Sequence, residues 1–348
     1  MRGILFHTAP SFPMNKNLSS IFALALAAAP AFSALGAEPK RVIVVTVTTG
    51  FRHGNSIPFA EKTLKRLGEE SKAYTVVDMV QQPSTPFLVS APAPKKPGDL
   101  APTADDEAKA KYADEMKKFD ESTVKWQQNE LKAKEPQPQW DEQMAKLLPA
   151  NLIAKHIDAV IFANTTGNLP LPDRDGFIKW VEDGHAFCGM HSAGDTFHGF
   201  PGYLDMVQAE FKTHGKQVPA DLVAGDKAHP ANAGIGETWN LSQEEMYEFK
   251  EGSHDRTKIH AIWFLRHAPQ DVNAAAYFPV SWCRMAGKGR VFYTSLGHRE
   301  DLWDETDAVK DRKNSPELSK QYQAHILGGI KWALGLAPGN AKPNPEVK

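Results

Sequence analysis

The sequence contains few cysteines, no excess of one charge and no long apolar run beyond its N-terminal region. With two cysteines in 348 residues, a disulfide framework is excluded, and neither cysteine lies in the spacing of a metal-binding or redox motif. Lys and Arg number 40 against 42 Asp and Glu, for a formal net charge of −2. We therefore expect no nucleic-acid partner. With 41% hydrophobic residues, the composition is that of an ordinary globular protein.

The N-terminal apolar segment, 18–29 (LSSIFALALAAA), follows Lys16 and precedes small residues up to Ala37. A positive start, a short apolar stretch and a small-residue cleavage region are typical of a secretory signal peptide. The segment is too short to span a bilayer as a helix. Prolines on both sides argue against the alternative, a buried N-terminal helix. We therefore predict that 1–37 is a signal peptide, with Met14 as an alternative start, and that the mature protein is periplasmic or secreted, without a membrane span.

Strand and helix patterns alternate along much of the chain. Residues 41–49 (RVIVVTVTT) are a continuous β-branched run, typical of a parallel strand buried on both faces. Further patterns follow at 57–67 (helix), 74–80 (strand), 159–163 (strand), 172–183 (helix) and 186–190 (strand). This alternation predicts an α/β fold with an open, mostly parallel sheet and helices on both faces.

Residues 82–150 interrupt this alternation with many prolines and charges. The pattern over 104–134 is a charged helix whose narrow apolar stripe is Tyr112, Met116, Phe119 and Trp126. We predict an inserted helical segment that rests on the domain or on a neighbouring chain, which would make a homo-oligomer. The last third carries antiparallel patterns instead, with strands at 259–266, 280–284 and 290–295 and a final helix ending before Gly335.

Polar, glycine-containing segments follow four of the predicted strands. They are 50–53 (GFRH), 165–168 (TTGN), 191–195 (HSAGD) and 297–300 (GHRE). The carboxyl ends of the strands in an open α/β sheet meet at the edge where ligands bind. We therefore predict one site at this edge, with ligand-binding side chains at Arg52, His53, Asn164, Thr166, Ser192 and Asp195.

The histidines of this edge allow two kinds of chemistry. An imidazole titrates near neutral pH and can move a proton to or from a hydroxyl group, and His191 and His298 are the predicted pair. The alternative is a divalent metal such as zinc. Its predicted ligands are His191, His298, His229 and Glu245, with His53, His214 and Asp195 as further candidates. None of these residues has the tight spacing of a local metal motif, so the fold would have to assemble the site.

Several ordered motifs carry a family resemblance. They are 49–53 (TGFRH), 184–195 (GHAFCGMHSAGD), 229–230 (HP), 244–247 (EEMY), 279–282 (PVSW) and 287–298 (GKGRVFYTSLGH). Together they resemble the ThuA-like, trehalose-utilisation family over residues 41–336, apart from 82–150. The resemblance implies a flavodoxin-like fold related to class I glutamine amidotransferases and an association with sugar metabolism. It also implies a single domain over 38–340, followed by a tail, 341–348.

The kinship with amidotransferases concerns the strand-to-helix elbow. Those enzymes carry a nucleophilic cysteine there, activated by a late His and Glu that His298 and Glu300 resemble, so Glu300 is the third residue with an implied catalytic role. The elbow of this chain is 189–192 (GMHS), with His191 at the position of the nucleophile and Cys188 inside the strand. We therefore expect no glutamine hydrolysis by that mechanism. A triad built on Ser192 is disfavoured, because adjacent residues rarely face each other at an elbow.

A small carbohydrate is the expected ligand. Trp303, in the acidic loop 299–316, is the predicted aromatic platform because the C–H faces of sugars pack on rings. We predict an exported enzyme that acts on a small glycoside or an oxidised sugar through a His-centred site, with or without a metal. The alternative is a non-catalytic sugar-binding protein. A third hypothesis is a structural or assembly role for the insertion at 82–150.

Overall fold

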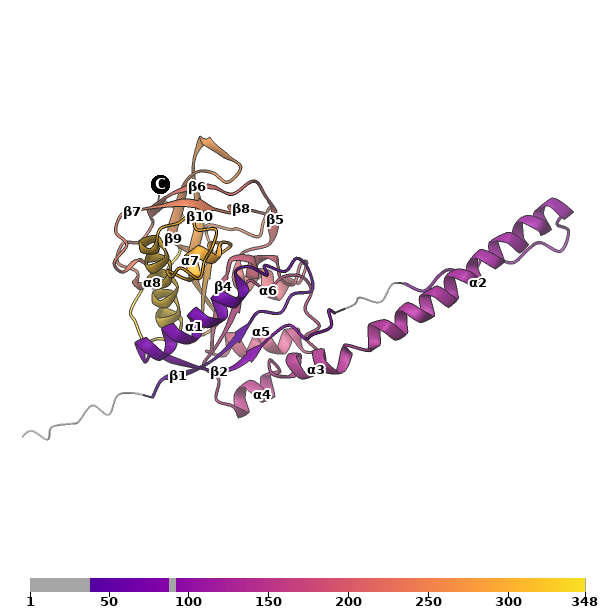
Figure 1. Cartoon of the computed structure of the whole chain (residues 1–348), viewed down its shortest axis with the longest axis horizontal. Helices are drawn as coiled ribbons and strands as arrows, with labels where there is room; N and C mark the ends of the chain where they lie inside the picture. The colour runs from indigo at the N-terminus through magenta and orange to yellow at the C-terminus, as the bar shows by residue number, and fades with distance from the viewer. Residues whose placement is uncertain (1–37, 88–91, 348) are drawn as a thin grey trace, which may run out of the picture. The chain divides into compact units, whose positions relative to one another are not determined.

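The predicted alternation of strands and helices is present in the computed structural model, which describes residues 38–87 and 92–347 (Figure 1). Its strands are β1 (Lys40–Val45), β2 (Tyr74–Val80), β3 (Ala159–Ala163), β4 (Ala186–Met190), β5 (Phe211–His214), β6 (Val218–Ala224), β7 (Thr238–Glu244), β8 (Tyr247–Phe249), β9 (His260–Ala268), β10 (Asp271–Ala286) and β11 (Gly289–Thr294). Its α-helices are α1 (Ile57–Ser71), α2 (Asp106–Lys134), α3 (Gln137–Ala145), α4 (Pro149–Ala154), α5 (Arg174–Glu182), α6 (Pro201–Val207), α7 (Glu300–Trp303) and α8 (Pro316–Ala333). Two short 3-10 helices are η1 (His191–Asp195) and η2 (Pro230–Asn232). The predicted signal peptide lies outside the described residues.

Among the described residues, nine strands form one sheet in the order β2-β1-β3-β4-β11-β10-β9-β6-β7. Neighbouring strands from β2 to β11 pair in parallel. The remaining strands, from β10 to β7, continue the sheet with antiparallel pairing. The order of the parallel half is that of flavodoxin-like folds. The α/β fold class predicted from the sequence is confirmed, and the antiparallel half accounts for the patterns of the last third.

Helices cover both faces of the parallel half, and β1 illustrates how its sequence serves both. Val42 and Val44 pack in a core cluster with α1 and α8, whereas Ile43 and Val45 pack in a second cluster with α3, α5 and α6. Successive side chains of a strand point to opposite faces, so an unbroken β-branched run is what a strand buried on both faces requires. The sheet is therefore the layer between two apolar cores.

The parallel arrangement brings the loops after β1, β3, β4 and β11 to one edge of the sheet. The first three of these loops also pair with one another, through bridges between Thr48 and Thr166 and between Gly167 and Thr196. Gly167 has a φ of 77°, and a Cβ there would lie 2.4 Å from Thr49 Oγ1. Only glycine fits this position, because the loops stack closely where the site is built.

The segment predicted as an insertion has two parts. In α2, which begins with the Asp105 side chain accepting from the Ala108 N–H at 2.8 Å, Ala133 is buried and the apolar stripe is half-buried. By contrast, Trp140, Met144 and Leu147 are fully buried in the core on the α5 face. The last part of the segment predicted as an insertion, 82–150, therefore packs in the core.

The predicted tail is attached to the domain. The Asn344 side chain pairs with both backbone groups of Ala261 in β9, accepting from its N–H at 2.7 Å and donating to its carbonyl at 3.0 Å. Arg256 donates to the carbonyl of Pro345 at 2.8 Å. Within residues 38–87 and 92–347, no helix has the length and apolar character that crossing a membrane requires.

Candidate functional site

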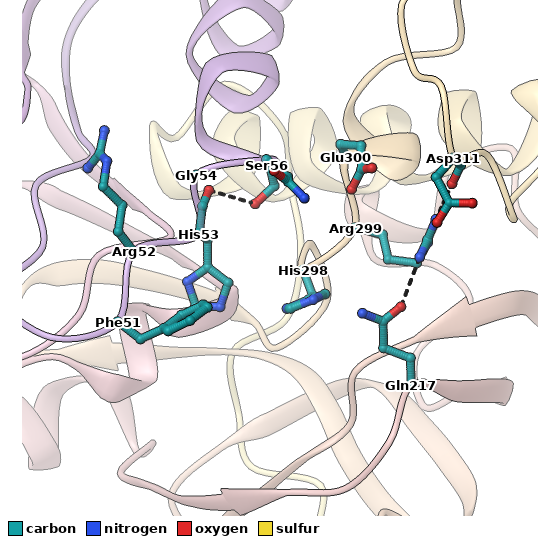
Figure 2. A pocket seen from close by; sticks show the side chains of 11 residues that line it. Phe51, Arg52, His53, Gly54, Ser56, Gln217, His298, Arg299, Glu300 and Asp311 are labelled. Carbon is teal, nitrogen blue, oxygen red and sulfur yellow. Dashed lines mark hydrogen bonds and ion pairs between the residues drawn. The ribbon is translucent and has the colours of Figure 1, made fainter.

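Three histidines that are far apart in the sequence meet at the carboxyl edge of the parallel strands. His53 follows β1, His191 follows β4 directly and His298 follows β11. Glu245 joins them from the turn between β7 and β8. One side-chain N or O atom of each residue lies within 4.8 Å of those of the other three. We call these four residues the His-Glu cluster; Figure 2 shows two of them, His53 and His298, next to each other among the residues that line a pocket.

His191 is at the centre of the His-Glu cluster. Its Nε2 lies 3.2 Å from His53 Nε2, 3.3 Å from His298 Nδ1 and 3.5 Å from Glu245 Oε2. Glu245 Oε2 also lies 3.2 Å from His298 Nδ1, and the Tyr247 hydroxyl lies 3.0 Å from His191 Nε2. The fold thus brings the two histidines that the sequence singled out into direct contact.

The backbone at the elbow fixes the direction of the His191 ring. His191 is fully buried with a φ of 49°, a left-handed conformation that is uncommon for residues other than glycine and that is held by surrounding contacts. The Tyr293 hydroxyl donates to the His191 carbonyl at 2.7 Å. His191 Nδ1 lies 2.9 Å from the Ser295 carbonyl. A carbonyl can only accept, so Nδ1 carries the proton and Nε2 of the neutral ring presents a lone pair to the cluster.

The three histidines differ in their tendency to carry charge. Burial, with a smaller effect of the charge on His298, lowers the pKa of His53 to about 4. Burial, together with the neighbouring His53, also holds the pKa of His191 well below its ordinary value. Burial acts in the same direction on His298, but the hydrogen bond that its ring donates to Glu245 and the charge of Glu244 outweigh it, so the pKa of His298 is raised. The cluster therefore combines two imidazoles whose pKa is lowered with one whose pKa is raised.

Glu244, next to the cluster residue Glu245, holds the loop that carries His298. Its Oε1 accepts from the backbone N–H groups of Gly297 at 2.9 Å and His298 at 2.7 Å, and Oε2 accepts from that of Arg299 at 3.4 Å. Glu244 is fully buried, and burial raises its pKa to about 7. The two adjacent carboxyl groups thus have separate tasks, one in the loop and one in the cluster.

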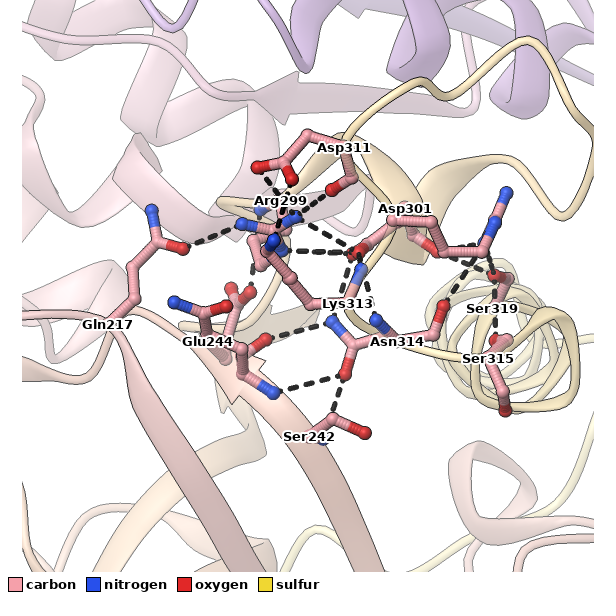
Figure 3. A network of polar contacts seen from close by, with 12 residues as sticks. Gln217, Ser242, Glu244, Arg299, Asp301, Asp311, Lys313, Asn314, Ser315 and Ser319 are labelled. Carbon is pink, nitrogen blue, oxygen red and sulfur yellow. Dashed lines mark hydrogen bonds and ion pairs between the residues drawn. The ribbon is translucent and has the colours of Figure 1, made fainter.

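A polar network extends this support away from the cluster (Figure 3). Arg299 contacts Asp301 through three hydrogen bonds and donates to Gln217 Oε1 at 2.9 Å. Asp301 is fully buried and accepts from the backbone N–H of Asn314 at 2.9 Å. The Asn314 amide in turn donates to the Gln243 carbonyl at 2.8 Å, just before Glu244. The loop after β11, the loop before α8 and β7 are therefore held as one unit.

Two cavities open beside the cluster, and both are lined by Phe51, His53 and His298. The first, of about 290 Å³, is polar and is lined also by Arg52, Asn55, Gln217, Arg299, Glu300 and Asp311. The second, of about 220 Å³, is more apolar and is lined also by Asp195, Phe211, His214, Glu245 and Tyr247. A small molecule in either cavity would touch the cluster.

The predicted ligand-binding residues fall into two groups. Arg52 and Asp195 line the cavities. Asn164, Thr166 and Ser192 are fully buried and act on neighbouring loops instead. The Asn164 amide donates to Ser56 Oγ at 2.7 Å, the Thr166 hydroxyl donates to the Phe51 carbonyl at 2.8 Å, and Ser192 Oγ lies 3.3 Å from His53 Nδ1. Their contribution is to position His53 and Phe51.

Three sequence predictions are corrected. Trp303 is 0% exposed and donates to the Gly297 carbonyl at 2.8 Å, so it is a core residue and offers no face to a sugar. His229 is the N-cap of η2, where its Nε2 is 3.5 Å from Cys283 Sγ, away from the cluster. Glu300 lines the polar cavity, but the carboxylate that pairs with His298 is Glu245.

Two aromatic residues of the site were missed from the sequence. Phe51 is 71% exposed at the junction of both cavities, with its ring edge-on to His53 at a centroid distance of 5.0 Å. Tyr247 is buried against His191, with ring centroids 4.5 Å apart. Their positions in the sequence could have indicated a place in the site, because Phe51 precedes His53 by two residues and Tyr247 follows Glu245 by two. His214, a metal candidate, contacts Glu245 Oε1 at 3.0 Å and lies outside the cluster itself.

Comparisons with known proteins agree with this architecture. The family model for ThuA, described as trehalose utilisation, matches residues 110–333. No curated protein matches the chain. A solved ThuA-like protein from Parabacteroides merdae superposes with a TM-score of 0.52 at 14% identity, covering 89% of this chain and 99% of that one. A second, from Bacteroides uniformis, gives a TM-score of 0.50 at 13% identity, covering 90% of this chain and 98% of that one. At these identities the two structures show a common fold.

Proposed function

Because this chain belongs to the ThuA family of trehalose utilisation, we propose that it is an exported enzyme of carbohydrate metabolism. Its substrate is a small glycoside or an oxidised sugar, bound beside the His-Glu cluster. The observation that carries the proposal is the contact between His191 Nε2 and His298 Nδ1, at 3.3 Å, next to two cavities. Environments that move the pKa values of two neighbouring groups in opposite directions are characteristic of acid and base roles.

The cavity walls suit a sugar. Carbohydrates present apolar C–H faces and hydroxyl groups, so their sites combine rings with fixed polar partners. Phe51, Phe211 and Tyr247 supply rings, and Asp195 and Glu300 supply carboxylates. Glycosidic oxygens and sugar carbonyls both need a proton donor or an electrophile as they react. The imidazole nitrogens, the carboxylate and the phenol group of the site lie within hydrogen-bond distance of their neighbours in the cluster. They can therefore supply or accept the proton that such a reaction needs.

Turnover of small glycosides tests the proposal against its alternative, a non-catalytic sugar-binding protein. We would incubate the mature protein with a panel of disaccharides and their keto derivatives and follow the products by mass spectrometry. Conversion of at least one compound is expected, and binding without conversion in calorimetry would favour the alternative. Neither binding nor conversion of any sugar would overturn both.

A pair of variants assigns the activity to the site. His298→Asn is expected to lower kcat/KM at least 100-fold, the usual contribution of a proton-transferring group. His156→Asn is the matched control, because His156 is exposed and precedes β3, at the opposite edge of the sheet. Equal loss of activity in both variants would contradict the assignment, provided that both retain the wild-type melting temperature.

Export is supported by the signal-peptide pattern of residues 1–37. N-terminal sequencing of the secreted protein is expected to show processing between Ala34 and Glu38. A cytoplasmic protein that retains Met1 or Met14 would contradict this part of the proposal and would leave the proposed chemistry intact.

A further inference from the structure

We infer that the His-Glu cluster, made of His53, His191, Glu245 and His298, binds one divalent transition-metal ion, with zinc as the best match. The inference rests on the proposed function only for what the ion would do there, because the geometry of the side chains stands on its own. Within the described ranges of the chain, no second group of His, Cys, Asp and Glu side chains converges in this way. The ligand set also differs from that expected from the sequence, since His53 takes the place of His229.

The distances between the ligand atoms fit one ion. Nitrogen and oxygen ligands about 2.0 to 2.1 Å from a tetrahedral zinc lie about 3.3 Å from one another. Four atom pairs of the cluster have this spacing. His191 Nε2 lies 3.2 Å from His53 Nε2, 3.3 Å from His298 Nδ1 and 3.5 Å from Glu245 Oε2, and Glu245 Oε2 lies 3.2 Å from His298 Nδ1. A single ion at the centre would therefore reach all four groups with little movement.

Hydrogen bonds alone do not account for the groups that surround His191 Nε2. His191 Nδ1 bonds to the Ser295 carbonyl, so the lone pair of Nε2 is the atom that faces the cluster. That one lone pair has the nitrogens of two other rings, a carboxylate oxygen and the Tyr247 hydroxyl around it. A lone pair accepts one good hydrogen bond and is repelled by a carboxylate oxygen. A cation would attract all of these lone pairs at once.

Three of the four cluster residues have an outer partner at the atom that faces away from the centre. Besides the His191 contact with Ser295, His53 Nδ1 lies 3.3 Å from Ser192 Oγ. Glu245 Oε1 lies 3.0 Å from His214 Nδ1. Such outer contacts orient metal ligands and fix the tautomers of ligating histidines. His214 is thus a positioning residue for Glu245.

The donor atoms define the class of ion. Three imidazole nitrogens and one carboxylate oxygen suit zinc and its first-row neighbours, whereas calcium and magnesium prefer oxygen ligands throughout. Thiolate, the ligand that favours copper(I) or iron-sulfur clusters, is not offered, because Cys188 and Cys283 are buried in β4 and β10. His53 and His298 line both cavities, so a sugar oxygen would reach the ion from either. There the ion would act as a Lewis acid on that oxygen.

Metal analysis of the wild-type protein is the first test. The mature protein, purified without added metal or chelator, is expected to carry about one equivalent of a transition metal per chain by mass spectrometry of the elements. After removal of the metal with a chelator, added cobalt(II) is expected to give the visible absorption of a tetrahedral site. Less than a tenth of an equivalent, together with no binding of added zinc or cobalt, would overturn the inference. Calcium or magnesium as the bound ion would overturn it as well.

Variants then identify the ligands. Glu245→Gln and His53→Asn are expected to weaken zinc binding at least 100-fold, and His214→Asn by about 10-fold, because it removes an outer contact. The control is His229→Asn, at the histidine predicted from the sequence but placed elsewhere, which is expected to keep its metal. Only variants that retain the wild-type melting temperature are compared. Metal loss in the control, or full retention in Glu245→Gln, would contradict the ligand set.

The outcomes separate this inference from the proposed function. A bound transition metal without sugar turnover would keep the metal site and reject the proposed function. Undiminished sugar turnover by metal-free protein would keep the function, assign His191 and His298 to proton transfer, and reject the metal site. Loss of turnover with the metal and its return with zinc would support both.

Discussion

His53 and His191 are 138 residues apart in the chain, yet their Nε2 atoms lie 3.2 Å from each other. The two residues follow β1 and β4, which are separated in the sheet by β3. Burial lowers the pKa of both rings, so two neutral imidazoles face each other where a fold of this type binds its ligands. The strand order thus assembles a site that no local stretch of sequence contains.

Replacement of Cys188 is expected to affect packing alone. Cys188 is fully buried within β4, between Ile161 of β3 and Phe292 of β11, and burial raises the pKa of its thiol. We predict that Cys188→Ala lowers the free energy of unfolding by about 1–3 kcal/mol and leaves sugar binding unchanged. Cys283→Ala removes the other buried thiol, in β10, and is the control for the packing effect of losing a buried thiol. Release of glutamate from glutamine by the wild type, lost in Cys188→Ala, would contradict this account of the elbow.

The strand ends could be found from the sequence because a buried parallel strand is a continuous apolar run that stops at polar residues. For this reason the sequence alone predicts the segments that carry His53, His191 and His298. Which of these side chains contact one another cannot be predicted from any short stretch of the sequence. Glu245 lies between β7 and β8, which belong to two different sheets, and the order of β11, β10, β9, β6 and β7 in the larger sheet brings it to the same edge.

The exposure of the aromatic side chains does not follow from the sequence pattern. Trp303 follows His298 in a polar loop, but its side chain turns into the core, where its N–H donates to the Gly297 carbonyl. Phe51 lies in an equally polar segment and is exposed. The two differ in whether the neighbouring helices leave room for a ring, and this depends on tertiary packing rather than on sequence pattern.

The pH dependence of stability is expected to include a contribution from His325 in α8. His325 is fully buried between Trp239 and Phe292, at ring centroid distances of 5.5 and 5.4 Å. Burial lowers its pKa from an ordinary value near 6.5 to about 4. Between these values the unfolded chain binds the proton and the folded protein does not. Stability therefore falls as the pH drops below 6.5, by on the order of 3 kcal/mol when the pH has passed below 4.

Urea unfolding at a series of pH values measures this contribution. His325→Gln cannot be protonated, so its free energy of unfolding is expected to decline less steeply between pH 6.5 and 4.5 than that of the wild type. The comparison uses the slopes, because the substitution changes the absolute stability as well. His156→Gln, at an exposed histidine, is the control and is expected to follow the wild-type slope. Parallel curves for all three proteins would contradict the assignment to His325.

Removal of α2 is expected to leave the α/β core folded. Among residues 106–134, only Ala133 is buried, so we predict cooperative unfolding after deletion of 92–132 and closure with a flexible Gly-Ser linker. A longer deletion, 92–147, also removes Trp140, Met144 and Leu147, which are fully buried. Loss of even one large core side chain costs about 3–5 kcal/mol. The longer deletion should therefore lose cooperative unfolding, and an equal effect of both deletions in calorimetry would be evidence against this division.

Phe51 is expected to contribute to sugar binding but not to stability. Its ring is 71% exposed and borders both cavities, so Phe51→Ala should change the free energy of unfolding by less than about 0.5 kcal/mol. Loss of a ring that packs on a sugar face should weaken binding by about 1 kcal/mol, or roughly five-fold. Phe51→Tyr keeps the ring and should restore the affinity.

The control for Phe51 is Tyr277→Ala in β10, because Tyr277 is also exposed, at 45%, and borders neither cavity. Calorimetric titration with the sugar that the wild type binds measures the affinity of each variant. A ring contact acts through its area, so its loss should appear in the affinity and not in the melting temperature. Unchanged affinity in Phe51→Ala, or equal losses in Phe51→Ala and Tyr277→Ala, would show that the sugar does not pack on this ring. The C–H faces would then have to pack on Phe211 or Tyr247, inside the more apolar cavity.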